Sequence, residues 1–181
     1  MADRIILGSG KLYVVEAEKD TSGEWVIPAD ADIEVEDARI GWIKGGASIA
    51  YTPSFYEAKD DLGKVSKVIV TTEEAILTAG VMTINAAGLN KLVSTGTYSE
   101  TSAERKLLIG GIDNFNGKQY VVHFLHEDPA DGDIRVTIIG SNTSGFEMQW
   151  QQEQETIVNA EFKAIPNDED GTLIIYREEI V

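Results

Sequence analysis

The sequence predicts a mainly β protein: an antiparallel β-sandwich or barrel with one short flanking α-helix at about residues 83–95 and a long hairpin at about residues 47–70. β-Branched and aromatic residues alternate with polar ones along most of the chain, which is the period of a half-buried strand. Clusters of Gly, Asn and Asp separate these segments at regular spacing, as turns do in antiparallel proteins. The 181 residues, 43% of them hydrophobic, predict a single domain spanning residues 1–181 with a real core.

Alternating segments in the first half of the chain predict short strands. In the first of them, Leu12 and Val14 share one face. Gly45 and Gly46 interrupt a longer segment, and the turn residues 60–64 join the two sides of the long hairpin. The expected strands are residues 11–16, 25–27, 33–35, 40–51, 57–59, 65–71 and 74–78.

The helix is predicted where the period changes. Leu89, Leu92 and Val93 are spaced as one apolar stripe of a helix. Thr83 can cap its N-terminus, and Gly96 fits its C-terminal end. Strands resume after it, at residues 105–110, 118–126, 134–140, 145–151, 156–164 and 172–176.

The chain is strongly acidic, with 31 Asp and Glu against 15 Lys and Arg, a formal net charge of -16. Residues 126–181 carry 13 of the acids and only three of the bases. Binding to the outside of a nucleic acid requires a basic surface, so this charge argues against it. The acidity is either a solubilising surface or a field that repels an anion.

Composition also limits the chemistry. The chain has no Cys, which excludes disulfides, thiolate zinc sites and cysteine nucleophiles. No segment approaches the ~20 apolar residues of a membrane span. The first residues lack the apolar segment of a signal peptide. We therefore expect that the protein is made in the cytosol and does not insert into a membrane.

Motif searches predict no enzyme, no metal and no cofactor. Residues 8–11 (GSGK) lack the earlier Gly and the following Ser or Thr of a phosphate-binding loop. His123 and His126 fall on opposite faces of a strand, and we expect one to pack and the other to face solvent. The acidic residues around Gly132 lack the calcium-loop register and predict a turn. No G-x-S-x-G motif occurs.

Two acidic rows are predicted on strand faces. In residues 145–156 (GFEMQWQQEQET), Phe146, Met148 and Trp150 share the parity expected to face the core. The opposite, polar parity consists of Glu147, Gln149, Gln151, Glu153 and Glu155. A second row consists of Asp30, Asp32, Glu34 and Glu36. Each row is either an ordinary solvated face or a deliberately anionic surface.

Residues 38–95 carry a family resemblance. They contain WIKGGA at 42–47, IAYTP at 49–53, DDLG at 60–63 and EEA at 73–75, and then the short helix with Leu89 and Leu92. In this arrangement the chain resembles the tail tube (major tail) proteins of bacteriophages, especially of phages that infect Firmicutes. The resemblance is weak over residues 1–37 and depends only on strand rhythm after residue 97.

The resemblance implies a structural protein of the virion tail, made in the bacterial cytoplasm. Such proteins are β-sandwiches flanked by a helix, which form hexameric rings that stack into a tube. The implied partners are other copies of the chain, the tape-measure protein inside the tube, and the tail terminator and distal tail or baseplate proteins at its ends. DNA passes through the channel, and we expect acidic residues facing the lumen to repel phosphates so that the DNA slides without binding.

The resemblance also implies two sets of functional residues. A hairpin that bridges to the neighbouring ring corresponds to residues 47–70, with these expected contact residues: Tyr51, Pro53, Phe55, Tyr56, Asp60, Asp61, Leu62 and Lys64. The expected lumen-lining residues are Glu147, Gln149, Gln151, Glu153 and Glu155, with residues 30–36 as the alternative row. Other interpretations are a tailocin or secretion-system tube, and a monomeric acidic β-sandwich that binds a small ligand or carbohydrate.

Overall fold

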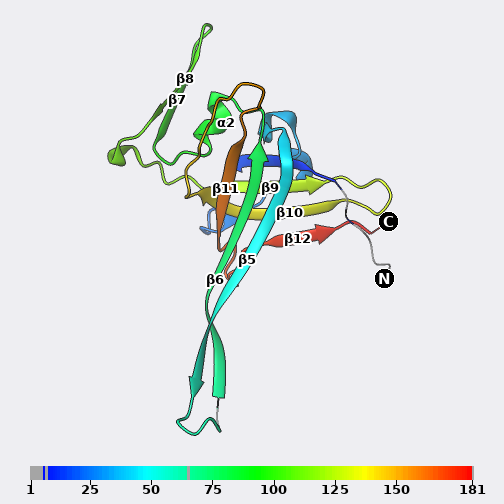
Figure 1. The fold of residues 1–181 in the computed structure, drawn as a ribbon, viewed down its shortest axis with the longest axis vertical. Coiled ribbons are helices and arrows are strands. Elements are labelled where there is room, and N and C mark those ends of the chain that lie inside the picture. Colours follow the sequence, from blue (N-terminus) through cyan, green and yellow to red (C-terminus); the bar gives the residue numbers. More distant parts are fainter. Residues whose placement is uncertain (1–5, 7, 65, 181) are drawn as a thin grey trace.

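The computed structural model describes residues 6, 8–64 and 66–180, and it confirms a mainly β, antiparallel protein (Figure 1). Most predicted strands are present within a few residues of their expected bounds. The strands are β1 (Lys11–Glu16), β2 (Glu18–Lys19), β3 (Trp25–Val26), β4 (Arg39–Gly41), β5 (Ile43–Lys59), β6 (Ser66–Val81), β7 (Gly96–Glu100), β8 (Arg105–Ile109), β9 (Tyr120–His126), β10 (Ile134–Asn142), β11 (Val158–Ile165) and β12 (Ile175–Glu178). The helices are α1 (Asp30–Ile33) and α2 (Ala86–Asn90), with single 3₁₀ turns η1 (Glu36–Ala38) and η2 (Ile112–Asn114).

The main sheet curves until its two ends meet, which makes it barrel-like. Its order is β4-β1-β9-β10-β11-β6-β5, with β12 also paired to β10. The end strands β4 and β5 are separated in sequence only by Trp42. Figure 1 shows β5, β6 and β11 running across the direction of β9, β10 and β12. At the closure, the Trp42 N–H donates to the Thr83 hydroxyl at 2.9 Å.

The main core fills the concave side of this sheet. It consists of inward-facing strand residues, including the fully buried Leu12, Val122, Ile138 and Phe162. Strand β9 is buried on both faces, so its sequence is an almost continuous apolar run rather than an alternating one.

The outer face of β1, β9 and β10 is covered by residues 25–38. Ile33 is fully buried there and packs with Tyr13, Val121 and Ile139. The predicted strand at residues 33–35 is wrong, because the chain forms α1 and η1 here. A helical turn lets Ile33 reach the outer face of the sheet, and this packing overrides the local alternation of acidic and apolar residues.

The helix predicted at residues 83–95 is much shorter than expected. α2 spans Ala86–Asn90, and its N-cap is Asn85, whose side chain accepts the Gly88 N–H at 2.8 Å. Thr83 is used at the sheet closure instead. No described helix is long and apolar enough to cross a membrane. Strand β7, which the sequence analysis missed, begins directly at Gly96 and pairs with β8.

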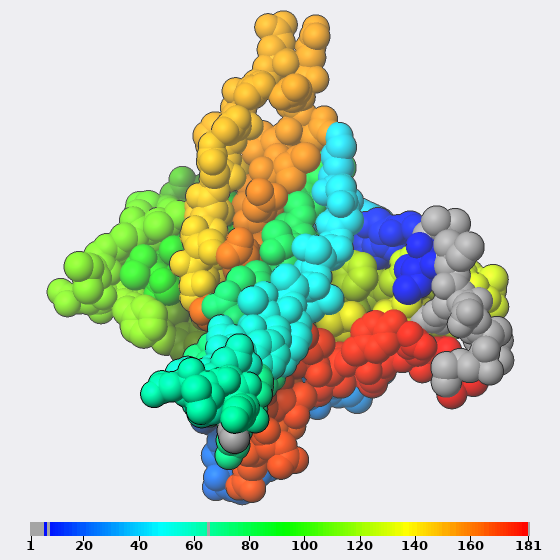
Figure 2. Space-filling view, turned by 60° about the horizontal axis from the view of Figure 1, so that its bottom comes forward, coloured from blue at the N-terminus to red at the C-terminus, as the bar shows by residue number. Residues whose placement is uncertain are grey.

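The strand predicted at residues 145–151 is also wrong. These residues run without regular secondary structure into a turn between Gln151 and Gln154, and the segment projects from the body (yellow to orange, Figure 2). Phe146 and Met148 pack against the main core as expected, whereas Trp150 is 78% exposed. The apolar contacts therefore end after Met148, where the segment leaves the body.

Strands β10 and β11 approach closely at Gly140, which pairs with Ala164. A Cβ atom at residue 140 would lie 2.1 Å from the carbonyl oxygen of Lys163. We predict that Gly140→Ala lowers the free energy of unfolding by about 1–3 kcal/mol, because the two backbones must separate. Urea denaturation measures the loss. The neighbouring Ser141→Ala is the control and should change stability by less than about 0.5 kcal/mol; equal stability of the two variants would contradict the prediction.

Candidate functional site

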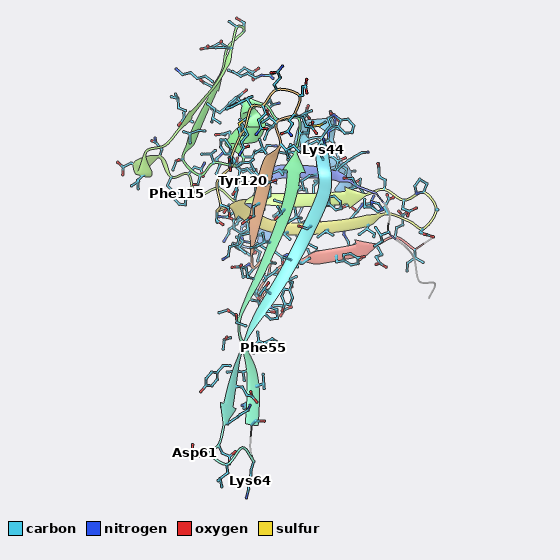
Figure 3. All side chains as sticks on the ribbon, viewed as in Figure 1. Lys44, Phe55, Asp61, Lys64, Phe115 and Tyr120 are labelled. Atoms are coloured by element: carbon cyan, nitrogen blue, oxygen red, sulfur yellow. The ribbon has the colours of Figure 1, made fainter. Side chains whose placement is uncertain are left out.

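The most conspicuous feature is a two-stranded arm that leaves the sheet (Figures 1 and 3). β5 and β6 pair from Ile43 and Val81 out to Lys59 and Ser66, so the hairpin predicted at residues 47–70 is present and longer. β11 covers the other edge of β6 only from Ile76 to Val81. Beyond that point the hairpin has no neighbouring strand among the described residues. We define the arm as residues 54–72.

The arm begins at a β-bulge. Ser54 pairs with Thr72 and Phe55 with Val70, so Thr71 is the extra residue. A bulge increases the local right-handed twist of a hairpin. Figure 3 shows the two strands crossing close to Phe55. The bulge therefore reorients the arm relative to the body.

The arm exposes apolar side chains on both faces. Phe55 pairs with Val70 and Tyr56 with Ile69, and successive pairs point to opposite faces. Phe55 is 62% and Tyr56 58% exposed. At the tip, Leu62 is also exposed, and the Gly63 N–H donates to the Asp60 carbonyl at 3.0 Å. Of the residues predicted to make contacts, Phe55, Tyr56 and Leu62 thus lie on an accessible projection.

Sequence reasoning predicted the second strand of this surface but did not name its apolar side chains among the contact residues. Val68, Ile69 and Val70 are all exposed, although consecutive apolar residues suggest a buried strand. The signal that identifies them is their position across a short polar turn from residues 55–57, where Val70 pairs with Phe55 and Ile69 with Tyr56. Of the other predicted residues, Pro53 is half-buried, and the Tyr51 hydroxyl donates to Glu73 at the base of the arm.

The arm carries no net charge. Its acids are Glu57, Asp60 and Asp61, and its bases are Lys59, Lys64 and Lys67. Lys59 and Glu57 form an ion pair at 2.9 Å. On a chain of net charge -16, a neutral apolar projection is an exception. Two like chains can therefore approach through the arm with little electrostatic repulsion.

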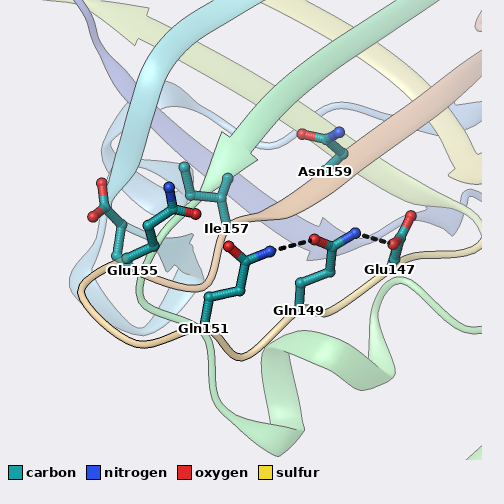
Figure 4. Close-up of a pocket in the computed structure, with 7 residues that line it drawn as sticks. Glu147, Gln149, Gln151, Glu155, Ile157 and Asn159 are labelled. Atoms are coloured by element: carbon teal, nitrogen blue, oxygen red, sulfur yellow. Dashed lines mark hydrogen bonds between the residues drawn. The ribbon is translucent and has the colours of Figure 1, made fainter.

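The second candidate surface is the polar row of residues 147–155 (Figure 4). The Gln151 amide donates to the Gln149 side-chain oxygen at 3.1 Å, and the Gln149 amide donates to Glu147. These side chains line a shallow hollow of about 240 Å³ with the following residues: Gln154, Glu155, Ile157 and Asn159. Four of the five predicted lumen residues are therefore together on one surface.

Glu153 does not belong to this polar row. It lies in the turn between Gln151 and Gln154 with φ of 64°, so the strand alternation that placed it there does not apply. Glu155 is in the row, but it forms an ion pair with Lys44 of β5. The polar row is consequently less negative than the sequence alone predicts.

The alternative acidic row does not exist as a single face. Asp30 and Glu34 point inward, where Arg177 donates to both Asp30 carboxylate oxygens at 2.5 and 2.9 Å. Glu34 accepts from Arg135 Nε at 2.7 Å. Glu36 pairs with Arg39, while Asp32 is exposed. The row is replaced by an ion-pair network that attaches α1 to the sheet.

One group of side chains among the described residues is spaced closely enough to hold a metal ion. It consists of Asp30, Glu34 and His123. The two arginines of the ion-pair network occupy the same carboxylates, so a cation would face like charges there. His123 Nε2 lies 3.1 Å from Glu34, and its Nδ1 lies 2.8 Å from the Thr137 hydroxyl. We interpret the cluster as structural.

Burial and hydrogen bonding shift the pKa values of this cluster in different ways. Burial lowers the pKa of His123, outweighing the opposing effect of Glu34. The hydrogen bond from Arg177 lowers the pKa of Asp30. The expectation that one histidine faces solvent is wrong, because His126 is also buried, with Nδ1 2.7 Å from the Ser9 carbonyl oxygen.

The acidic turns are turns, as predicted. The Asp128 carboxylate accepts the N–H groups of Ala130 and Asp131 at 3.0 and 3.2 Å. Asp168 accepts the Thr172 N–H at 2.8 Å. These bonds close the loops locally. They leave the arm and the polar row as the candidate functional surfaces.

A comparison with protein-family models found no match, and a comparison with curated proteins found none. The resemblance to phage tail tube proteins therefore stays a prediction.

The buried histidine predicts a pH dependence. The unfolded chain takes up a proton at His123 near pH 6.5, whereas the folded chain resists it because burial lowers the pKa. The stability that comes from keeping His123 neutral is present above pH 6.5. As the pH falls below 6.5, the free energy of unfolding decreases, with a slope of at most about 1.4 kcal/mol per pH unit. Denaturation of wild type and His123→Gln between pH 7.5 and 5.5 measures it; equal slopes would contradict the prediction.

Proposed function

We propose that the protein is a self-assembling tube subunit of the phage tail-tube kind, in which rings of the chain stack into a conduit. The observation that carries the proposal is the arm: a neutral, apolar, two-stranded projection on a chain of net charge -16. Monomeric soluble proteins rarely leave a contiguous apolar surface exposed, and such surfaces mark contacts with other proteins.

Self-association is the simplest use of the arm. Unpaired hairpin edges offer backbone N–H and C=O groups to another chain, and exposed aromatic residues supply the apolar contact. Subunits that each carry a charge of -16 repel one another, so their contacts must be neutral or well paired. The arm meets this requirement.

The polar row supports the conduit part of the proposal. The side chains that line this surface are Glu and Gln, and the adjacent Lys44 is paired with Glu155, so the surface offers phosphates no unpaired cation and DNA moving past it would not bind. In this proposal Glu147, Gln149, Gln151 and Glu155 line the lumen and Glu153 lies beside them. The tape-measure protein would occupy the lumen, and the tail terminator and baseplate proteins would contact the two ends of the tube.

Removing the arm tests the assembly. We predict that replacing residues 55–71 with Asn-Gly, which joins the paired residues Ser54 and Thr72 by a tight turn, gives folded monomers or isolated rings. The body should still fold because the residues of β6 that pair with β11, Ile76–Val81, lie outside the arm. Electron microscopy and sedimentation of concentrated samples measure tube formation. Long tubes from the armless chain would assign the contact elsewhere.

A point variant separates the arm from general surface effects. Phe55→Ser with Tyr56→Ser should raise the protein concentration needed for assembly at least tenfold. Ile180→Ser removes an even more exposed apolar side chain outside the arm and should assemble as wild type. A wild-type chain that stays monomeric at every concentration and salt would overturn the tube and favour a monomeric binding module.

The polar row predicts the behaviour of DNA. We predict that Glu147→Lys with Gln149→Lys leaves tubes intact but gives them at least tenfold greater retention of short duplex DNA at low salt, because lysines release counterions on binding. Co-sedimentation with tubes measures this retention, which should fall as salt rises. Gln152→Lys with Glu153→Lys makes the same charge change in the adjacent turn. Equal retention by both double variants would contradict the special role of the polar row.

A further inference from the structure

A large open groove lies on the far side of the body from the arm. Its volume is about 760 Å³, which is the size of a typical binding cleft. Its apolar lining comes from the following residues: Leu92, Val93, Ile109, Phe115 and Phe146. The rest of its described lining is Ser, Thr, Asn and Gly from residues 94–95 and 141–145, without a charged side chain. We call it the neutral groove.

The rim of the neutral groove is also apolar and exposed. Ile112 in η2 is 93% exposed and Phe115 is 68% exposed. Leu108 and Ile109 of β8 are exposed beside them. The β7–β8 hairpin pairs with no other described strand. This end of the molecule therefore presents a second uncovered apolar surface, formed by a part of the chain distant in sequence from the arm.

We propose that the neutral groove is the receptor for the arm of a second copy of this chain. The inference rests on the proposed function and names the surface that the arm contacts. The arm is chosen as occupant because both surfaces are apolar and both lack net charge on a strongly acidic chain. A partner of another kind would have no need of this matched neutrality, whereas two copies of a chain with charge -16 do.

The arm suits the groove in chemistry. It presents Phe55 with Val70 on one face and Tyr56 with Ile69 on the other. Aromatic side chains seated in an apolar pocket commonly supply most of the energy of a protein contact. The polar remainder of the groove, mostly Ser, Thr and Asn, can satisfy the free backbone groups at the edges of a hairpin.

The groove cannot be filled by the arm of its own chain. Figure 3 shows Phe115 beside the body, while Phe55 and the tip residues Asp61 and Lys64 extend away from it. The β5–β6 pairing is continuous from body to tip, so the arm cannot fold back without breaking it. A contact between unlike surfaces of identical chains leaves a free arm and a free groove at the ends, and so it extends into a filament unless the rotation closes it into a ring. This is the kind of contact a stacked tube requires.

Disulfide trapping tests the contact, since the chain has no native Cys. One copy carries Tyr56→Cys and a differently tagged copy carries Phe115→Cys or, as a second position, Ile112→Cys. We expect mixed oxidation under assembly conditions to give the two-tag dimer at least tenfold above the yield with Val26→Cys, an exposed control position outside the groove. All three groove and control positions are exposed, so the single variants should fold.

The outcomes separate this inference from the proposed function. Tubes together with a two-tag dimer support both. Tubes whose arm and groove cysteines give no more dimer than the control overturn the receptor assignment and leave the tube intact. No tubes or rings, with no dimer, overturn both. Phe115→Lys provides a readout without cysteine. It should raise the protein concentration needed for assembly at least tenfold while the denaturation midpoint stays unchanged. Normal assembly of this variant would also overturn the receptor assignment.

Discussion

The pairing of β6 with β11 is the interaction on which the rest of the structure depends. It anchors the inner half of a 16-residue strand in the core, with Ala75, Leu77, Ala79 and Val81 all buried. The outer half has no such cover, and only β5 accompanies it. Because one continuous ladder runs through both halves, the fixed inner part holds the outer part as a stiff projection. The arm is thus a consequence of how the barrel-like body is built.

The distribution of charge suggests how this projection is used. The body bears most of the acidity, and part of that acidity is used internally, where Arg135 and Arg177 hold Asp30 and Glu34 against the sheet. The arm and the neutral groove stand apart from it. For an acidic chain that repels its own copies, contacts between copies are expected where charge is lowest, and apolar area at those places supplies the attraction.

Sequence patterns were most reliable where both local propensity and packing favour the same structure. β1, β9 and β10 match their expected segments closely because their alternation or apolar runs correspond to buried faces. Patterns misled where packing opposed them. Residues 30–38 alternate like a strand yet bend into helical turns to bury Ile33. Residues 145–151 alternate too, but they pair with none of the described strands, and Glu153 lies in a turn outside the predicted row.

By itself the sequence determined the antiparallel β class, the long hairpin with its exposed aromatic residues, the acidity, and the absence of cysteine chemistry. These follow from local periodicity, turn residues and composition. Only the tertiary structure decided that the sheet closes at Trp42, that the acids of α1 are paired, and that residues 92–95, 109–115 and 141–146 meet in one neutral groove. The physical reason is that these features join segments far apart in the chain, and a linear pattern carries no information about which distant surfaces will come into contact.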